Sequence, residues 1–141
     1  MSAVIKESAT ADQQPLVSLR NLNKHYGDFA AVDNISLDIM QGEFLTFLGS
    51  SGSGKSTTLS MLAGFETPSS GEIQVEGKSL IKVPPHKRGI GMVFQRYSLF
   101  PHLSVRDNIA FPLSIRKLPA AERERQVDAM LKLVQLEQFA H

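Results

Sequence analysis

A chain of 141 residues with 42% hydrophobic residues is long enough to bury one core, and this composition excludes an intrinsically disordered protein. The net charge of +1 is too small to favour a nucleic acid or a membrane surface as the partner. Because cysteine is absent, disulfides, thiolate metal sites and cysteine nucleophiles are excluded. No apolar run reaches the length of a membrane span, and the N-terminal sequence lacks the apolar segment of a signal peptide.

The N-terminal part of the chain predicts a tail followed by a pair of strands. Residues 1–14 are polar, and we expect them to form a mobile tail. Apolar residues alternate imperfectly along residues 16–27 and more cleanly along residues 29–39. Since Gly27 and Asp28 lie between them, these two segments predict paired antiparallel strands.

A buried strand and a helix are predicted on either side of a glycine-rich loop. Residues 43–48 form a short, nearly continuous apolar run, which is typical of a strand buried on both faces. Residues 55–63 contain no helix breaker and carry apolar residues on one side, at Leu59, Leu62 and Ala63. They predict a helix that is ended by Gly64 and Pro68.

The remaining segments predict two strands and two helices. Residues 71–77 alternate between bounding glycines and predict a strand, whereas the polar residues 78–88 predict a loop. Residues 90–95 predict a second buried strand. Ser104 is expected to open a helix, with Asp107 in capping-box spacing, that is interrupted by a proline at position 112. A long amphipathic helix is predicted over 119–140, with helical spacing at Val127, Met130, Leu131, Val134 and Gln138.

The loop between the buried strand and its helix carries the strongest chemical signal. It matches the pattern G-x-x-x-x-G-K-[ST] with the residues Gly49, Ser50, Ser51, Gly52, Ser53, Gly54, Lys55, Ser56 and Thr57. A strand before the loop and a helix after it are the context that this phosphate-binding motif requires. The alternative is a flexible Gly/Ser linker, but a linker would not join an apolar strand to a breaker-free helix through a lysine.

Each residue type in this loop has a role in holding a triphosphate. The glycines permit positive φ and close approach of the backbone to the phosphate oxygens. The free N–H groups and the dipole at the start of the helix favour an anion. Lys55 adds a positive charge for the β and γ phosphates, and the Ser56 hydroxyl is a ligand for Mg²⁺. We therefore expect the loop to bind a nucleoside triphosphate, namely ATP with Mg²⁺.

The finer form of the loop, GSSGSGKST, resembles the Walker A segment of ABC transporter ATPases. The sequence NKHYG (residues 23–27) looks like the family segment with an adenine-stacking aromatic residue, and MVFQ (92–95) resembles the strand that ends in the Q-loop glutamine. Residues 97–109 are similar to the segment that follows this glutamine in importer ATPases, above all in the spermidine/putrescine-like group. The resemblance implies an α/β fold, a P-loop NTPase of the ABC ATPase type with an N-terminal antiparallel β subdomain.

The resemblance also implies roles for residues outside the loop. Tyr26 would stack its ring on adenine; the alternative is an ordinary tyrosine at the end of a strand. Gln95 would reach Mg²⁺ and the attacking water and couple the nucleotide site to the transporter, or it is a solvated residue at a strand terminus. Residues 97–102 would contact a helix of the membrane subunit, or they form a locally packed surface loop.

Several parts of the family's apparatus are not found in these 141 residues. In the family, the signature segment, the Walker B strand with its carboxylates, and the switch histidine come later, and no substitute is found here. Residues 29–33 form an apolar run ending in aspartate, but we expect them to belong to the antiparallel sheet. We therefore assign no catalytic residue, and we expect residues 15–141 to be the N-terminal part of an ABC ATPase domain, truncated before the signature, with an incomplete core sheet.

The resemblance implies the ATP-binding subunit of an ABC importer, a peripheral protein on the cytoplasmic face of the inner membrane. Its partners would be transmembrane permease subunits, a second copy of the ATPase and, indirectly, an external solute-binding protein, without nucleic acid. As a family such proteins are ATPases, whereas the truncated chain is expected to be inactive. The alternatives are a catalytically inactive nucleotide-binding fragment, a soluble P-loop ATPase, kinase or GTPase, and an ABC ATPase outside transport.

Overall fold

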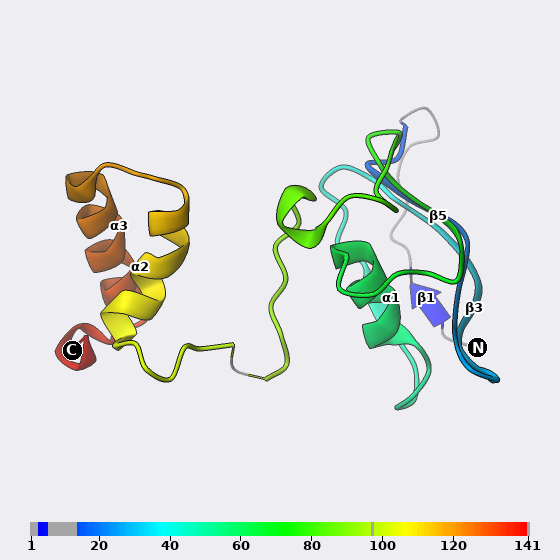
Figure 1. The fold of residues 1–141 in the computed structure, drawn as a ribbon, viewed down its shortest axis with the longest axis horizontal. Helices are drawn as coiled ribbons and strands as arrows, with labels where there is room; N and C mark the ends of the chain where they lie inside the picture. The colour runs from blue at the N-terminus through cyan, green and yellow to red at the C-terminus, as the bar shows by residue number, and fades with distance from the viewer. Residues whose placement is uncertain (1–2, 6–13, 97, 141) are drawn as a thin grey trace. The chain divides into compact units, whose positions relative to one another are not determined.

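The computed structural model describes residues 3–5, 14–96 and 98–140 (Figure 1). The chain forms two compact units, Met1–Met92 and Val93–His141. Among the described residues, the first unit contains a four-stranded and a two-stranded antiparallel sheet and one α-helix, and the second unit is a helical hairpin. Each unit has its own cluster of buried apolar side chains.

The sheet of the first unit confirms the predicted strand pair. Strand β2 (Val17–Tyr26) pairs antiparallel with β3 (Phe29–Ile39) on one side and with β5 (Ser70–Val75) on the other. The short strand β6 (Lys78–Ser79) pairs with β5 and completes the order β3-β2-β5-β6. The aspartate-ending run 29–33 lies in β3, as expected.

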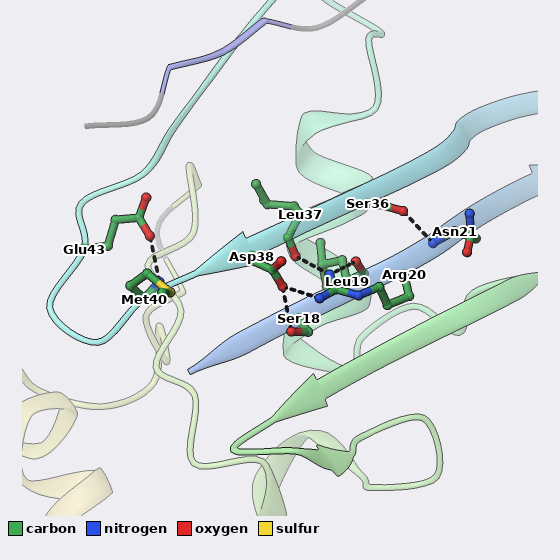
Figure 2. A network of polar contacts seen from close by, with 9 residues as sticks. All are labelled: Ser18, Leu19, Arg20, Asn21, Ser36, Leu37, Asp38, Met40 and Glu43. Carbon is green, nitrogen blue, oxygen red and sulfur yellow. Dashed lines mark hydrogen bonds and ion pairs between the residues drawn. The ribbon is translucent and has the colours of Figure 1, made fainter. Parts of the chain in front are cut away.

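A bulge explains why the apolar alternation along β2 is imperfect. Leu19 and Leu22 are three residues apart, yet both are buried, because the register with β3 shifts between them. Asn21 has a positive φ of 46° at this point, and its backbone N–H donates to the Ser36 hydroxyl oxygen (Figure 2). Asparagine tolerates this left-handed conformation better than most residues. The bulge therefore allows a spacing of three where a regular strand requires two.

Polar contacts hold the other end of the β2–β3 pair. Asp38 accepts a hydrogen bond of 2.7 Å from the Ser18 hydroxyl and forms an ion pair of 2.6 Å with Arg20 (Figure 2). In the turn that follows β3, the Glu43 carboxylate accepts a hydrogen bond of 2.7 Å from the Met40 backbone N–H. Glu43 therefore belongs to the turn, and the next strand begins beyond it.

The strand predicted over residues 43–48 is shorter and less buried than expected. Strand β4 (Thr46–Leu48) pairs antiparallel with β1 (Ala3–Ile5), and these two strands form a separate sheet. Phe44 is 88% exposed, so burial on both faces was wrong for this segment. The strand β1 lies within the segment 1–14 that was expected to be a tail, most of which is outside the described residues.

Residues 90–95 do not form a strand, which corrects the prediction for this segment. Val93 is 99% exposed and Phe94 is 44% exposed. A strand buried on both faces exists only where flanking strands accept its backbone hydrogen bonds and other layers cover its faces. Among the described residues no strand pairs with this segment, so its apolar pattern alone does not make it a strand.

The helix α1 (Lys55–Ala63) begins and ends as predicted, and the predicted apolar side is buried in part. Gly64 ends it with φ of 87°, and its N–H donates to the Met61 carbonyl. Ala63 is buried and Leu62 packs against the core, as expected, whereas Leu59 is 43% exposed. Met61, which was not on the predicted side, is fully buried. The core of this unit consists of Leu19, Leu22, Val32, Leu37, Met61, Ile73 and Leu80.

An arginine closes the C-terminal end of α1. In the predicted loop 78–88, which also contains the short 3-10 helix Pro85–Lys87, Arg88 donates hydrogen bonds of 2.8 and 2.9 Å to the Met61 and Leu62 carbonyls. It donates another of 2.8 Å to the Val83 carbonyl. A Cβ at Gly64 would lie 2.5 Å from Arg88 Nε, so glycine is required at this position both for its φ and for space. Burial lowers the pKa of the Arg88 guanidinium.

The second unit is a hairpin of α2 (Val105–Ile115) and α3 (Ala120–Leu133) around Val127, Leu131 and Ala140 (Figure 1). The predicted cap is confirmed, because the Asp107 backbone N–H donates to the Ser104 hydroxyl oxygen. Two predictions for this unit were wrong. The first is that the proline at 112 interrupts the helix, whereas it lies inside α2 on the exposed side. Proline has no N–H to donate to the carbonyl one turn earlier, but on the exposed side water can donate to that carbonyl instead.

The predicted long helix 119–140 ends early, which is the second correction. Gln135 takes a positive φ of 57°, and the Leu136 N–H donates to the Leu131 carbonyl, so α3 stops at Leu133 in a Schellman motif. A 3-10 turn over Glu137–Phe139 then brings Ala140 into the cluster of buried residues. The apolar spacing that continues to Val134 and Gln138 therefore does not correspond to a longer helix.

The contacts of Arg88 generate a stability prediction. We expect Arg88→Lys to lower the free energy of unfolding by about 1–3 kcal/mol, because lysine cannot donate from several fixed positions and leaves helix carbonyls without partners. Arg116→Lys is the matched control, since Arg116 is exposed at the end of α2. Urea unfolding followed by circular dichroism measures both variants. Equal stability of the two variants would contradict this role of Arg88.

Candidate phosphate-binding site

The predicted phosphate loop connects β4 to α1 in the expected order. Gly54 is the N-cap of α1 with φ of 85°, and no side chain accepts hydrogen bonds from the first turn of the helix. The backbone N–H groups at this end are therefore available to an external acceptor. Together with the helix dipole they favour an anion at this position.

The ammonium group of Lys55 lies within the loop. Its Nζ donates hydrogen bonds of 2.9 and 2.6 Å to the Gly49 and Ser50 carbonyls and one of 3.1 Å to the Ser53 hydroxyl. The loop thus wraps around a positive charge that belongs to the first residue of its own helix. A phosphate at the helix N-terminus would meet this charge directly.

The loop is pressed against the sheet at Gly54. A Cβ at Gly54 would lie 2.4 Å from the Ala31 carbonyl oxygen, and Gly54 is buried. Gly52 also has a positive φ, of 78°, but a Cβ there would meet no atom within 4 Å. Gly54 is therefore required for close packing, whereas Gly52 is required only for its backbone conformation.

A cavity of about 540 Å³ lies beside the loop. The loop side is formed by Gly52, Ser53, Gly54 and Lys55, and the other side mainly by residues 30–36 of β3. A second cavity of about 520 Å³ is lined by Lys55, Ser56 and apolar side chains of β4 and α1, including the exposed Leu59. The phosphate loop therefore lies between two open spaces, the first of which is lined by its glycines.

Thr58 is a loop-supporting residue that the sequence analysis missed. It is buried, and its hydroxyl donates a hydrogen bond of 2.9 Å to the Gly54 carbonyl, to which its backbone N–H also donates. These two bonds fix the carbonyl of the N-cap and so the direction in which the loop enters α1. The available signal was a polar residue four positions after the last glycine, on the side of the helix that faces the core.

The structure places Tyr26 at the same end of the hairpin as the phosphate loop. Tyr26 pairs with Phe29 and the preceding residue His25 pairs with Ala30, whose neighbour Ala31 packs against Gly54. The Tyr26 side chain is 48% exposed, so its ring is accessible. The sequence analysis did not single out Lys24, whose Nζ lies 4.9 Å from the centre of this ring.

The structure does not bring every predicted site residue together. Gln95 is exposed and belongs to the second unit, so its place relative to the phosphate loop is not defined and its role stays a prediction. Residue 97 of the predicted docking loop lies outside the described residues. Phe100 of the same loop packs against Phe111 of α2, with ring centres 4.5 Å apart.

The residues of the loop fit a magnesium ion that is bound mainly through phosphate. In the part of the chain that the structure describes, no group of three or more acidic or histidine side chains could hold a metal by itself. Magnesium at nucleotide sites needs few protein oxygens, because phosphates and waters supply the others. Ser56 offers one such oxygen on an exposed side chain in the first turn of α1.

The fold and loop are those of an ATP-binding cassette. The ABC transporter family matches residues 32–141, and the chain belongs to this family. The dimeric structure of MJ0796, a bacterial ABC transporter cassette, superimposes with a TM-score of 0.75 at 31% identity, over 89% of this chain and 60% of that one. Its post-hydrolysis state bound to ADP and Pi gives a TM-score of 0.74 at 31% identity, over 88% and 60%. The predicted fold class is confirmed.

Within the family the chain is similar to polyamine import proteins. It is 51% identical over 126 residues to the spermidine/putrescine import ATP-binding protein PotA of Nitrosomonas eutropha. This alignment covers 89% of this chain and 35% of the relative. It is 53% identical over 126 residues to the putrescine transport ATP-binding protein PotG of Escherichia coli K12, over 89% and 33%. The chain thus spans about a third of the length of the curated relatives it matches. The predicted resemblance to this group is confirmed.

Within the described residues, none of the helices has the length and apolar character needed to cross a bilayer.

The two loop glycines provide a matched pair of variants. We expect Gly54→Ala to lower the melting temperature clearly more than Gly52→Ala, because both add strain at a positive φ but only the first collides with the Ala31 carbonyl. Gly52→Ala should cost about 1 kcal/mol, the usual penalty for a left-handed residue with a side chain. Calorimetry of both variants measures the difference. Equal melting temperatures would show that the loop is not packed against β3 as described.

Proposed function

We propose that this chain is the N-terminal part of the ATP-binding subunit of an ABC importer and that its phosphate loop binds the triphosphate of MgATP. One observation carries the proposal: the Lys55 ammonium is held at the open N-terminus of α1 by the carbonyls of Gly49 and Ser50. A lysine without a role in the loop would be solvated on the surface instead. Its position among backbone donors is suited to an anion of high charge.

Binding follows from what the loop residues do. The backbone N–H groups from Gly54 to Thr57 donate to phosphate oxygens, and Lys55 exchanges its carbonyl partners for the β and γ phosphates. Tyr26 stacks its ring on the base at the end of the β2–β3 hairpin. Ser56 provides a hydroxyl to Mg²⁺, which supplies charge neutralisation of the phosphates when bound.

The second unit is assigned the coupling role. In this proposal Gln95 contacts Mg²⁺ and the attacking water, and residues 97–102 contact a helix of the membrane subunit. The similarity to PotA and PotG supports an importer of the polyamine type. The partners are then permease subunits, a second ATPase subunit and, indirectly, an external solute-binding protein, and the location is the cytoplasmic face of the inner membrane.

Hydrolysis requires more than the phosphate loop. Phosphoryl transfer depends on a residue that orients the attacking water and on carboxylates that position the metal. None of the residues assigned to the site, from Tyr26 to Gln95, is a carboxylate. We therefore propose that the 15–141 segment binds nucleotide and that the 141-residue polypeptide by itself does not turn it over.

Nucleotide binding is tested by isothermal titration of MgATP into the chain and into its Lys55→Ala variant. We expect the variant to lose about tenfold to a hundredfold in affinity, because a charge-assisted contact to phosphate contributes about 1.5–3 kcal/mol. Lys78→Ala is the control, since Lys78 is an exposed lysine in β6. Unchanged affinity in Lys55→Ala would refute the proposed function.

Turnover is tested separately with the same purified chain. We expect phosphate release at the rate of the protein-free buffer, even where MgATP is bound, because no carboxylate of the site is assigned to activate the attacking water. A phosphate-release assay at saturating MgATP measures it, and the Lys55→Ala variant controls for contaminating ATPases. Hydrolysis that disappears in Lys55→Ala would overturn the proposal that binding occurs without turnover.

A further inference from the structure

The Lys24 side chain is largely buried and contacts three different groups. Its side chain is 14% exposed, and its Nζ forms an ion pair of 3.0 Å with Glu66 and a hydrogen bond of 2.8 Å to the Thr67 carbonyl. The same Nζ lies 4.9 Å from the centre of the Tyr26 ring. One ammonium group thus joins a carboxylate, a backbone carbonyl and an aromatic ring.

Glu66 holds this ammonium from the loop that follows α1. The pKa of the Glu66 carboxyl lies below its ordinary value, chiefly because Lys24 donates a hydrogen bond to it, while burial acts in the opposite direction. Hydrogen bonding to the Tyr26 side chain contributes to the same lowering. The loop itself is fixed to β2, since the His25 backbone N–H donates to the Ser69 hydroxyl oxygen over 2.9 Å.

These contacts fix one side of the Tyr26 ring and leave the ring accessible. A cation above an aromatic face is attracted by the π-electrons, most strongly where it is shielded from water, as Lys24 is here. The ring remains 48% exposed and lies at the end of the hairpin that packs against the phosphate loop. A ring that is already ordered loses less entropy when a flat ligand stacks on it.

We propose that Lys24 and Glu66 are positioning residues that hold the Tyr26 ring ready to stack on the base of a bound nucleoside triphosphate. This inference rests on the proposed nucleotide binding and adds the groups that determine recognition of the base. Lys24 does not contact the phosphates, and Glu66 does not contact the ligand. They act through the position of Tyr26, so their effect is confined to the base.

The competing explanation is that the Lys24–Glu66 pair only attaches the loop 64–70 to β2. The two explanations differ in what they predict for a ligand without a base. A positioning role changes the affinity for ATP and not for inorganic tripolyphosphate, which occupies the phosphate loop alone. A purely structural role, acting through the end of α1, changes both affinities or neither.

The test is a titration of the 141-residue chain with ATP and with tripolyphosphate, both with Mg²⁺. We expect Lys24→Met to weaken ATP binding about threefold to tenfold, in line with a shielded cation–π contact, and to leave tripolyphosphate binding unchanged. Glu66→Gln should shift the ratio of the two affinities in the same direction. Lys24→Arg keeps the charge above the ring and should restore most of the ratio.

The control variants separate the possible failures. Arg20→Met removes an ion pair at the opposite end of the same hairpin, with Asp38, and should leave the ratio unchanged (Figure 2). Tyr26→Ala should reproduce the loss of Lys24→Met, and combining the two should add nothing further. Lys55→Ala should weaken the binding of both ligands about tenfold to a hundredfold. If Lys55→Ala has no effect on either affinity, the proposed function fails. If Lys55→Ala weakens binding but Lys24→Met changes both affinities equally, or changes neither, only the positioning role fails.

A direct signal from the ring completes the experiment. The chain has no tryptophan and two tyrosines, at positions 26 and 97, so a Tyr97→Phe background leaves Tyr26 as the only tyrosine emitter. We expect ATP, but not tripolyphosphate, to quench this fluorescence, and Lys24→Met to reduce the quenching at equal occupancy. Quenching that is the same with and without Lys24 would overturn the inference even if the variant is less stable.

Discussion

The close contact between Gly54 and the Ala31 carbonyl is the constraint from which the candidate site is built. At this point a glycine with positive φ ends the phosphate loop, begins α1 and touches β3. Because Gly54 has no side chain, the helix N-terminus lies directly against the sheet. The Thr58 hydroxyl donates a hydrogen bond to the Gly54 carbonyl and so fixes its direction. The loop can then close around the Lys55 ammonium, which a looser junction would release to solvent.

The same contact relates the loop to the end of the β2–β3 hairpin. Ala31 is the third residue of β3 after the turn at Gly27 and Asp28, so the contacts that hold the hairpin also place Tyr26 relative to the phosphate loop. The hairpin is fixed at the opposite end by Arg20 and Asp38, and at this end by Lys24 and Glu66. Ion pairs on the surface contribute little to the free energy of unfolding, because solvent screens them. The Lys24 side chain is only 14% exposed, so its ion pair is screened less. Its contribution is to order a ring more than to stabilise the fold.

The sequence patterns correctly predicted the elements that depend on interactions between residues close together in the chain. The Gly-rich loop, the start and end of α1, the Ser104 cap and the β2–β3 pair were all confirmed, because each depends on residues a few positions apart. The predictions for residues 43–48 and 90–95 were wrong in extent or type, since a strand also needs partners and covering layers that a pattern does not contain. The early end of α3 was decided by Gln135, a residue without the usual signal for a left-handed cap.

The sequence by itself determined the phosphate-loop motif, its position between strand and helix, and the family to which the chain belongs. Only the tertiary structure decided that Met61 and not Leu59 of α1 is buried, that Arg88 closes the C-terminal end of this helix, and that Lys24, Tyr26 and Glu66 form one cluster. The physical reason is distance along the chain. Lys24 and Glu66 are joined only because β2 pairs with β5 and the loop after α1 folds onto β2, and no periodicity within either segment encodes that pairing.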